Sequence, residues 1–286
     1  MKAYHILFVV LVLATTSYVA AGDIALSPEL GAKAFIVKAD KNGLWEKTLF
    51  VQFPQKRRVL STNDGLVDVV AVVNHAAHSG LWDCSTDTRK PGQPCPAMVY
   101  LQKSRERAAQ RVGVRVADIA VVGTAADMDN LAVVTKTTEP FVVTALVTAG
   151  AKGNAIRTGA EDATFVEPDP AFPNTVENRP PKPGTVNVLL LTNAKLTDGG
   201  LARAIVTVTE AKTAAFEDLC VRSTLHKELQ ATGTGTDSVI IVSGTSGPTV
   251  AFPGGHSLIW SMIGDAVHEA VMEALEKQNG FKRLVK

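Results

Sequence analysis

The chain has 286 residues, of which 46% are hydrophobic and 20% are charged, and its formal net charge is +1. A chain of this length and apolar content can bury a large core, which excludes an intrinsically disordered protein. The near-neutral charge and the 6% aromatic content argue against nucleic acid or an anionic membrane surface as a partner.

The first segment has the three parts of a secretory signal peptide. Lys2 gives a basic start, residues 6–14 form an unbroken apolar run, and mostly small residues then lead to Ala21. We expect cleavage between Ala21 and Gly22, which leaves residues 22–286 as the mature domain. An uncleaved membrane anchor is the disfavoured alternative, because the apolar run falls well short of the ~20 residues that span a bilayer. No later stretch is long and apolar enough to span, so we expect a periplasmic or secreted protein without membrane insertion after cleavage.

Two of the three cysteines, Cys84 and Cys95, flank a turn-rich segment that is typical of a surface loop. In an exported protein, two cysteines placed in this way are expected to form a disulfide. Cys220 ends an apolar run, and we expect it to be a buried small hydrophobic residue.

Strand and helix patterns are interspersed along the chain. Runs rich in Val, Ile, Leu and Thr, bounded by Gly, Asn or Asp, predict strands at residues 35–37, 48–53, 67–73, 119–123, 131–134, 141–148, 186–192 and 238–242. Helical periodicity of apolar residues predicts helices at residues 99–112, 201–219 and 258–278, the last being the most regular. This mixture predicts an α/β (mixed α+β) fold, in which a mixed sheet is layered with helices in a single globular domain.

Residues 167–184 contain six prolines and are expected to form an internal loop. The segments on either side of this loop resemble each other weakly. Residues 123–127 precede one predicted strand, and residues 233–237, which have a similar Gly-Thr…Asp pattern, precede another. Two pseudo-equivalent halves are therefore one interpretation, although chance recurrence of common turn residues explains the likeness better.

The most unusual stretch is residues 231–237, Ala-Thr-Gly-Thr-Gly-Thr-Asp, which we call the Gly-Thr loop. Glycines let a backbone fold tightly, and threonine hydroxyls can donate or accept hydrogen bonds. Such a loop can hold an oxyanion, or it can be an ordinary turn. It is neither a phosphate-binding P-loop nor a dinucleotide-binding motif, because the required Lys and glycine spacing are absent.

Lys212 falls within the apolar stripe of the helix predicted at residues 201–219, where a solvated lysine is not expected. Its stem can snorkel to solvent, or its charge can point into a site. Glu210 lies on another face if this helix is continuous, whereas a strand ending near Glu210 is the alternative.

Three histidines have candidate roles in catalysis or metal binding. His256 follows two glycines at the start of the last predicted helix, so it can be an acid or base in a cleft, or a surface residue near a helix cap. His75 and His78 have helical spacing, with Asp83 nearby, but no third ligand is fixed by the spacing. We therefore predict no metal site.

Several motifs occur in the order found in adenosylcobinamide amidohydrolases, a family that this chain resembles over most of its mature length, most strongly from Thr148 to the end. In chain order they are Thr148-Ala-Gly150 with Asn154-Ala155 and Gly159, Val186-Asn187, Thr209-Glu-Ala-Lys-Thr213, residues 231–238, and Gly255-His256 with Gly264 and Val267. The resemblance implies hydrolysis of the amide that joins aminopropanol to the corrin ring, which turns adenosylcobinamide into adenosylcobyric acid for cobalamin salvage. It implies a corrinoid as the small-molecule partner and no cofactor, with cobalt present only as part of the substrate. The signal peptide is unusual for an enzyme of intracellular salvage, which leaves open whether the adenosyl group is required.

Amide hydrolysis needs a base for water, a stabilised oxyanion and a proton for the departing amine. We assign Glu210 as the base, Lys212 with the backbone of residues 233–236 as the oxyanion site, and His256 as the acid, with Asp237 as a further titratable candidate. The expected substrate-binding residues are Asn154, Asn187, Thr232, Thr234 and Thr236. The alternative function is a periplasmic corrinoid-binding protein without turnover, although the chain lacks a cobalt-ligating Asp-x-His-x-x-Gly motif.

Overall fold

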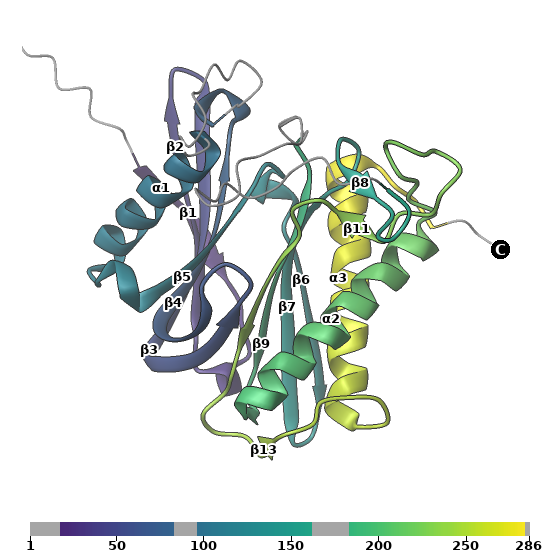
Figure 1. Cartoon of the computed structure of the whole chain (residues 1–286). Helices are drawn as coiled ribbons and strands as arrows, with labels where there is room; N and C mark the ends of the chain where they lie inside the picture. Colours follow the sequence, from purple (N-terminus) through teal and green to yellow (C-terminus); the bar gives the residue numbers. More distant parts are fainter. Residues whose placement is uncertain (1–17, 83–95, 162–182, 284–286) are drawn as a thin grey trace, which may run out of the picture.

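The computed structural model describes residues 18–82, 96–161 and 183–283 (Figure 1). The predicted disulfide between Cys84 and Cys95 lies outside these residues. The same holds for the signal segment up to residue 17 and for residues 167–182 of the Pro-rich loop.

The described strands include a nine-stranded mixed sheet in the order β1-β2-β3-β12-β9-β7-β6, from which β4 and β5 branch at β3. Only the β12–β9 and β4–β5 pairs of this sheet are parallel. Its strands are β1 (Tyr18–Ile24), β2 (Lys33–Lys41), β3 (Leu44–Ser61), β4 (Gly65–Ala77), β5 (Ile119–Thr124), β6 (Ala132–Thr138), β7 (Phe141–Gly150), β9 (Thr185–Thr192) and β12 (Ser238–Val242). Two short pairs accompany it, β8 (Ala155–Ile156) with β11 (Gly233–Thr234) and β10 (Lys195–Leu196) with β13 (Thr249–Val250).

The described part of the chain has three α-helices on the two outer faces of the sheet, α1 (Pro96–Val112) on one side and α2 (Asp198–Asp218) with α3 (Leu258–Asn279) on the other (Figure 1). Four single 3₁₀ turns complete the described elements: η1 (Pro28–Leu30), η2 (Ser79–Leu81), η3 (Val116–Asp118) and η4 (Met128–Asn130). None of the helices within the described ranges combines the length and hydropathy needed to cross a bilayer.

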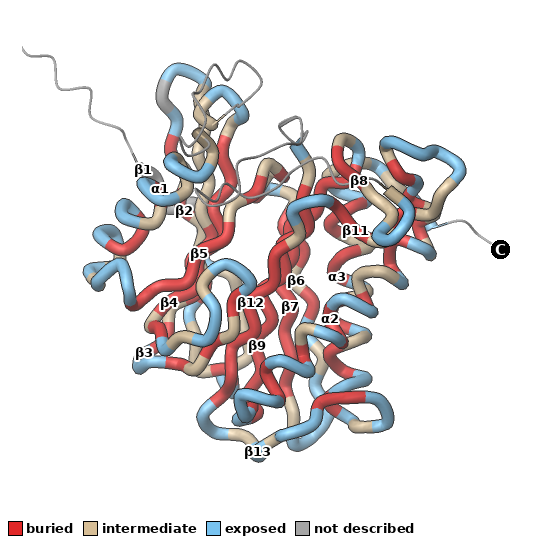
Figure 2. Tube along the Cα trace, in the orientation of Figure 1, coloured by how far each residue is buried: buried red, intermediate tan, exposed pale blue. Residues whose placement is uncertain are grey.

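The sheet curls, and this curl creates an inner core to which none of the described α-helices contributes. Leu49 and Val72 from β3 and β4 pack in one cluster with Leu146 and Leu189 from β7 and β9. Alternate residues of the same strands face outward, so that Val143 and Val188 join the α2–α3 core while Phe50 and Val73 join the α1 core. Both faces of the central strands are therefore buried (Figure 2).

The structure confirms the predicted mixed α/β architecture and all three predicted helices. Because α2 is continuous through Glu210, the alternative of a strand ending there is wrong. The strands that follow the two similar Gly-Thr segments occupy different positions in the sheet: β6 is an edge strand, and β12 lies between β3 and β9. These positions do not support two pseudo-equivalent halves.

Two further sequence interpretations are corrected. His75 lies in β4 and His78 directly after it, so the two imidazoles do not share a helix face. The described residues contain no group of three His, Cys, Asp or Glu side chains that could hold a metal. Cys220 is half-buried rather than buried, because it turns the chain out of α2 with a positive φ of 49°.

Candidate functional site

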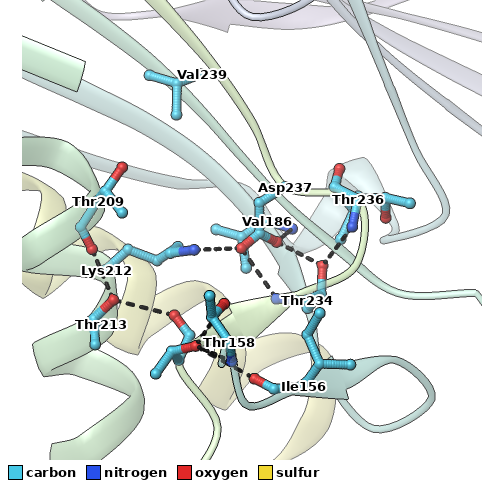
Figure 3. A network of polar contacts seen from close by, with 12 residues as sticks. Ile156, Thr158, Val186, Thr209, Lys212, Thr213, Thr234, Thr236, Asp237 and Val239 are labelled. Atoms are coloured by element: carbon cyan, nitrogen blue, oxygen red, sulfur yellow. Dashed lines mark hydrogen bonds and ion pairs between the residues drawn. The ribbon is translucent and has the colours of Figure 1, made fainter. Parts of the chain in front are cut away.

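Lys212 forms a close ion pair with Asp237, the last residue of the Gly-Thr loop (Figure 3). Lys212 Nζ lies 2.5 Å from Asp237 Oδ2, and the two side chains are only 12% and 15% exposed. The lysine projects from the buried side of α2, and the aspartate is brought opposite it by the turn between β11 and β12. The Lys212 ammonium group therefore faces the Gly-Thr loop, and the side chain does not snorkel to solvent.

Every acceptor position of the Asp237 carboxylate is in use. Oδ1 accepts from the backbone N–H of Val186 at 2.9 Å and from the Thr234 hydroxyl at 2.5 Å. Oδ2 accepts from the Thr234 backbone N–H at 3.0 Å and from Lys212. A carboxylate offers about four lone-pair sites, so this one is saturated. Asp237 thus fastens the loop to β9 and α2, and it has no lone pair left for a water molecule.

Lys212 has donors to spare. An ammonium group carries three N–H donors, and within the described ranges only Asp237 accepts a hydrogen bond from it. Its remaining N–H groups are available to a ligand, in a setting that is mostly shielded from solvent.

The backbone of the Gly-Thr loop is engaged with the protein itself. The N–H of Gly235 donates to the carbonyl of Asn154 at 3.3 Å, and the N–H of Thr236 donates to the Thr234 hydroxyl at 3.4 Å. The N–H of Thr234 donates to Asp237. The backbone N–H groups of residues 234–236, which the sequence analysis assigned to an oxyanion site, therefore already have acceptors within the protein.

A side chain at position 233 would meet the charged ends of Lys212 and Asp237. A Cβ atom there would lie 2.3 Å from Lys212 Nζ and 2.4 Å from Asp237 Oδ2, closer than any real contact. The ion pair therefore lies directly against the loop backbone, and a side chain at this position would push the end of Lys212 or Asp237 aside.

The threonine hydroxyls of the loop also bond within the protein. Thr236 donates to the carbonyl of Gly184 at 2.7 Å, and Thr232 lies 3.2 Å from the hydroxyl of Thr158. On the helix side, the Thr213 hydroxyl donates to the Thr232 carbonyl at 3.1 Å (Figure 3). These contacts hold the loop between β8 and α2.

Of the two predicted binding asparagines, Asn154 braces the loop and Asn187 lies in the inner core. Asn154 donates to the Gly184 carbonyl at 3.0 Å and is 9% exposed. Asn187 is fully buried, and its Nδ2 donates to Asn74 Oδ1 and to the Gly123 carbonyl, both at 2.9 Å.

Asn187 belongs to a buried chain of hydrogen bonds, which we call the amide network (Asn74, Thr148, Thr185 and Asn187). Asn74 Nδ2 donates to the Thr148 hydroxyl at 2.9 Å, and the Thr185 hydroxyl reaches the carbonyl of Thr236 in the Gly-Thr loop at 2.5 Å. The network joins β4, β7 and β9 to the loop. Sequence reasoning missed Asn74, Thr148 and Thr185 as members; the usable signal was an asparagine within or next to a strongly apolar run, as at Asn74 and Asn187, because a buried amide needs hydrogen-bond partners.

Two predicted catalytic residues lie outside these contacts. Glu210 is exposed, and among the described residues no hydrogen bond or ion pair involves its carboxylate; two positions along a helix turn it about 200° from Lys212. His256 is exposed, with φ at 71°, just before Ser257 caps α3. No contact within the described ranges joins either residue to Asp237.

Comparison with known proteins connects this arrangement to a described family. The family model for adenosylcobinamide amidohydrolase matches residues 34–283. An uncharacterized protein of Methanocaldococcus jannaschii is 45% identical over 240 residues, which cover 82% of this chain and 88% of that relative. The family match includes every candidate residue from Asn154 to His256.

Proposed function

We propose that this chain, which belongs to the adenosylcobinamide amidohydrolase family, hydrolyses the amide between aminopropanol and the corrin ring of cobinamide-type corrinoids. Water adds to the amide carbonyl, the C–N bond breaks, and the products are cobyric acid and free aminopropanol. Family membership implies an amidohydrolase; the choice of substrate and the roles of residues belong to the proposal. Cobalt enters only as part of the corrinoid.

The observation that carries the proposal is the Lys212 ammonium, held by Asp237 and still able to donate. A tetrahedral intermediate of amide hydrolysis places a negative charge on the former carbonyl oxygen, and a fixed cation in a water-poor setting stabilises that charge strongly. Asp237 holds and orients the Lys212 ammonium, which makes Asp237 a positioning residue in this proposal. Asn154 and the loop threonines hold the same loop in place.

The proposed base and acid are Glu210 and His256. The Glu210 carboxylate keeps its lone pairs for water, in contrast to Asp237, whose lone pairs are all used. Both groups lie away from the ion pair, so each can act on an amide held at Lys212 only if it comes within hydrogen-bond reach of the attacking water or the departing amine. Asn187 supports the loop from the inner core rather than from the surface.

A corrinoid-binding protein without turnover is the alternative. The saturation of Asp237 and the engagement of the loop amides favour it, because they leave no base inside the network. Incubating the purified protein with cobinamide and searching for cobyric acid by mass spectrometry separates the two functions. Hydrolysis would be rejected if cobinamide and adenosylcobinamide, tested side by side, both bind and stay unchanged.

The residue assignments are tested by matched variants. Glu210→Gln should lower turnover by about 10²–10⁴-fold with corrinoid binding retained, since Gln cannot take a proton. Lys212→Met should cost about 10²–10³-fold in the chemical step. Glu217→Gln, an exposed glutamate of the same helix, is the control and should turn over normally. A Glu210→Gln protein as active as this control would exclude Glu210 as the base.

Export is also part of the proposal, based on the signal-like segment before Gly22. Cleavage after Ala21 would shorten β1 to residues 22–24. Sequencing the mature N-terminus should find Gly22 or a close neighbour, whereas an intact Met1 in a membrane fraction would contradict export.

A further inference from the structure

The outer face of the β3–β4 hairpin continues past the edge of the α2–α3 core. In the register of these strands Leu60 is paired with Leu66 and Arg58 with Asp68, so the four side chains share one face of the sheet. Arg58 shows which face this is, because its guanidinium binds both Asp68 of β4 and Asp198 at the start of α2. Leu60 and Leu66 therefore lie on the side of the sheet that α2 covers.

Apolar side chains stay exposed where this core ends. Leu60 and Ile205 of α2 are half-buried and pack against the margin of the α2–α3 core. Next to them, Leu66 is 39% exposed and Val206 is 45% exposed. We call these four residues the apolar strip. It has two members on the hairpin and two on α2, and Arg58 joins the hairpin to α2 beside it.

The strip leads along α2 to the Lys212–Asp237 ion pair. Ile205, Thr209 and Lys212 are spaced at i, i+4 and i+7, so they follow one another along one face of the helix. On the sheet side, Val239 of β12 follows Asp237 by two residues and belongs to the same core. Figure 3 shows Thr209 and Val239 above the ion pair in that view. The Lys212 ammonium, with its unused N–H donors, therefore lies at one end of the strip.

Val206 connects the strip to the proposed base. It precedes Glu210 by four residues, so the two side chains are neighbours on the exposed side of α2. The other end of the strip is marked by Asp198, which lies ~20 Å from Lys212 by the rise of the helix. A ligand that covers Val206 and reaches Lys212 thus spans the part of α2 that carries both groups assigned to catalysis.

We propose that the apolar strip is the surface on which the corrin ring of the substrate lies while the amide reaches Lys212. A corrin macrocycle carries methyl and methylene groups around its rim, and removing these groups and the strip from water favours binding. A ligand with a polar amide at the edge of an apolar body matches a surface that ends at a shielded ammonium, whereas a second apolar protein surface does not. The inference rests on the proposed corrinoid substrate, but it needs only binding and not hydrolysis.

The experiment measures cobinamide binding by equilibrium dialysis, with the corrinoid absorbance as readout. Leu66→Ser and Val206→Ser should each weaken binding by about three- to tenfold, and the double variant by roughly tenfold or more. Val116→Ser and Leu225→Ser change the same residue types at positions that are 36% and 63% exposed outside the strip, and they should bind within about twofold of wild type. Val206→Leu keeps the apolar surface and should also bind normally.

Steady-state kinetics separates ring binding from the chemical step. The ring makes the same contacts before and during attack on the amide, so the double variant should raise KM for cobinamide and leave kcat within about twofold of wild type. Lys212→Met should instead act mainly on kcat. A purely structural effect of the strip variants would lower the folded fraction, and with it kcat, without this split.

Two outcomes would overturn the inference. One is a double variant that binds cobinamide as tightly as the control variants. The other is a self-association of wild type, seen by size-exclusion chromatography, that the double variant abolishes with cobinamide binding unchanged; the strip would then be an interface between copies of the chain. If strip variants lose binding but no cobyric acid ever forms, the strip stands and hydrolysis fails. If cobyric acid forms and the strip variants behave like their controls, hydrolysis stands and the strip fails.

Discussion

Lowering the pH from 8 to 5 should destabilise this protein through His75. The imidazole is 7% exposed and forms hydrogen bonds with Thr48 and Tyr100 in its neutral form. Burial lowers its pKa to about 4; Glu46 opposes this effect and Arg107 adds to it. In the unfolded chain the same imidazole returns to its ordinary pKa of about 6.5.

The size and sign of the effect follow from linkage between protonation and folding. Between pH 6.5 and 4 the unfolded state binds a proton that the folded state does not, so stability is full above this window and is lost as the pH falls through it. The loss is about 2 kcal/mol at pH 5 and reaches about 3 kcal/mol below pH 4. This is a large share of the ~5–15 kcal/mol that stabilises a typical domain.

Urea unfolding of wild type and His75→Gln at pH 8, 6.5 and 5 measures this contribution. The variant can start from a lower stability, but between pH 8 and 5 it should lose about 2 kcal/mol less than wild type. His226→Gln removes an imidazole that is 48% exposed, and it serves as the control. Parallel losses in wild type and His75→Gln would refute a neutral, buried His75.

Two other predictions concern the contacts around the Gly-Thr loop. Gly233→Ala should break the Lys212–Asp237 pair and abolish most turnover in the cobinamide assay, whereas Gly264→Ala, where a Cβ meets nothing within 4 Å, should stay active and fold at least as stably. Asn187→Leu should lower the unfolding free energy by about 2–4 kcal/mol, because it leaves two buried acceptors without a donor. Stability close to wild type in chemical denaturation would contradict that role for the amide network.

The helices were the most predictable part of the fold. Apolar residues at the helical period placed the last helix at residues 258–278, and the structure has it at Leu258–Asn279. Lys212 was also recognisable as unusual, because a lysine inside an apolar stripe is rarely buried unless it has a partner of opposite charge. Its partner Asp237 could not be identified, since the pairing depends on how β11 and β12 bring the loop back to α2.

The strand that carries His75 shows why other parts were not predictable. Residues 71–77 of β4 are all buried, because α1 covers one face and the inner core lies on the other. Burial on both faces removes the alternation that identifies a strand, so the strand was predicted only over residues 67–73, and His75 and His78 were interpreted as a pair with helical spacing. The branching of β4 and β5 from β3 depends on contacts between distant segments that no local pattern encodes.

The rigidity of the Gly-Thr loop limits how any chemistry at Lys212 can work. The loop is tied to β9 through Asp237, to the inner core through Thr185, and to α2 through Thr213. A loop with these anchors does not need to rearrange when charge develops on a substrate, and electrostatic stabilisation depends on that preorganisation. The substrate must therefore approach a fixed ammonium, and the groups that move protons must reach it from outside the network. Because the lone pairs of Asp237 are all in use, the assignment of a carboxylate base depends on Glu210, and its substitution tests that assignment directly.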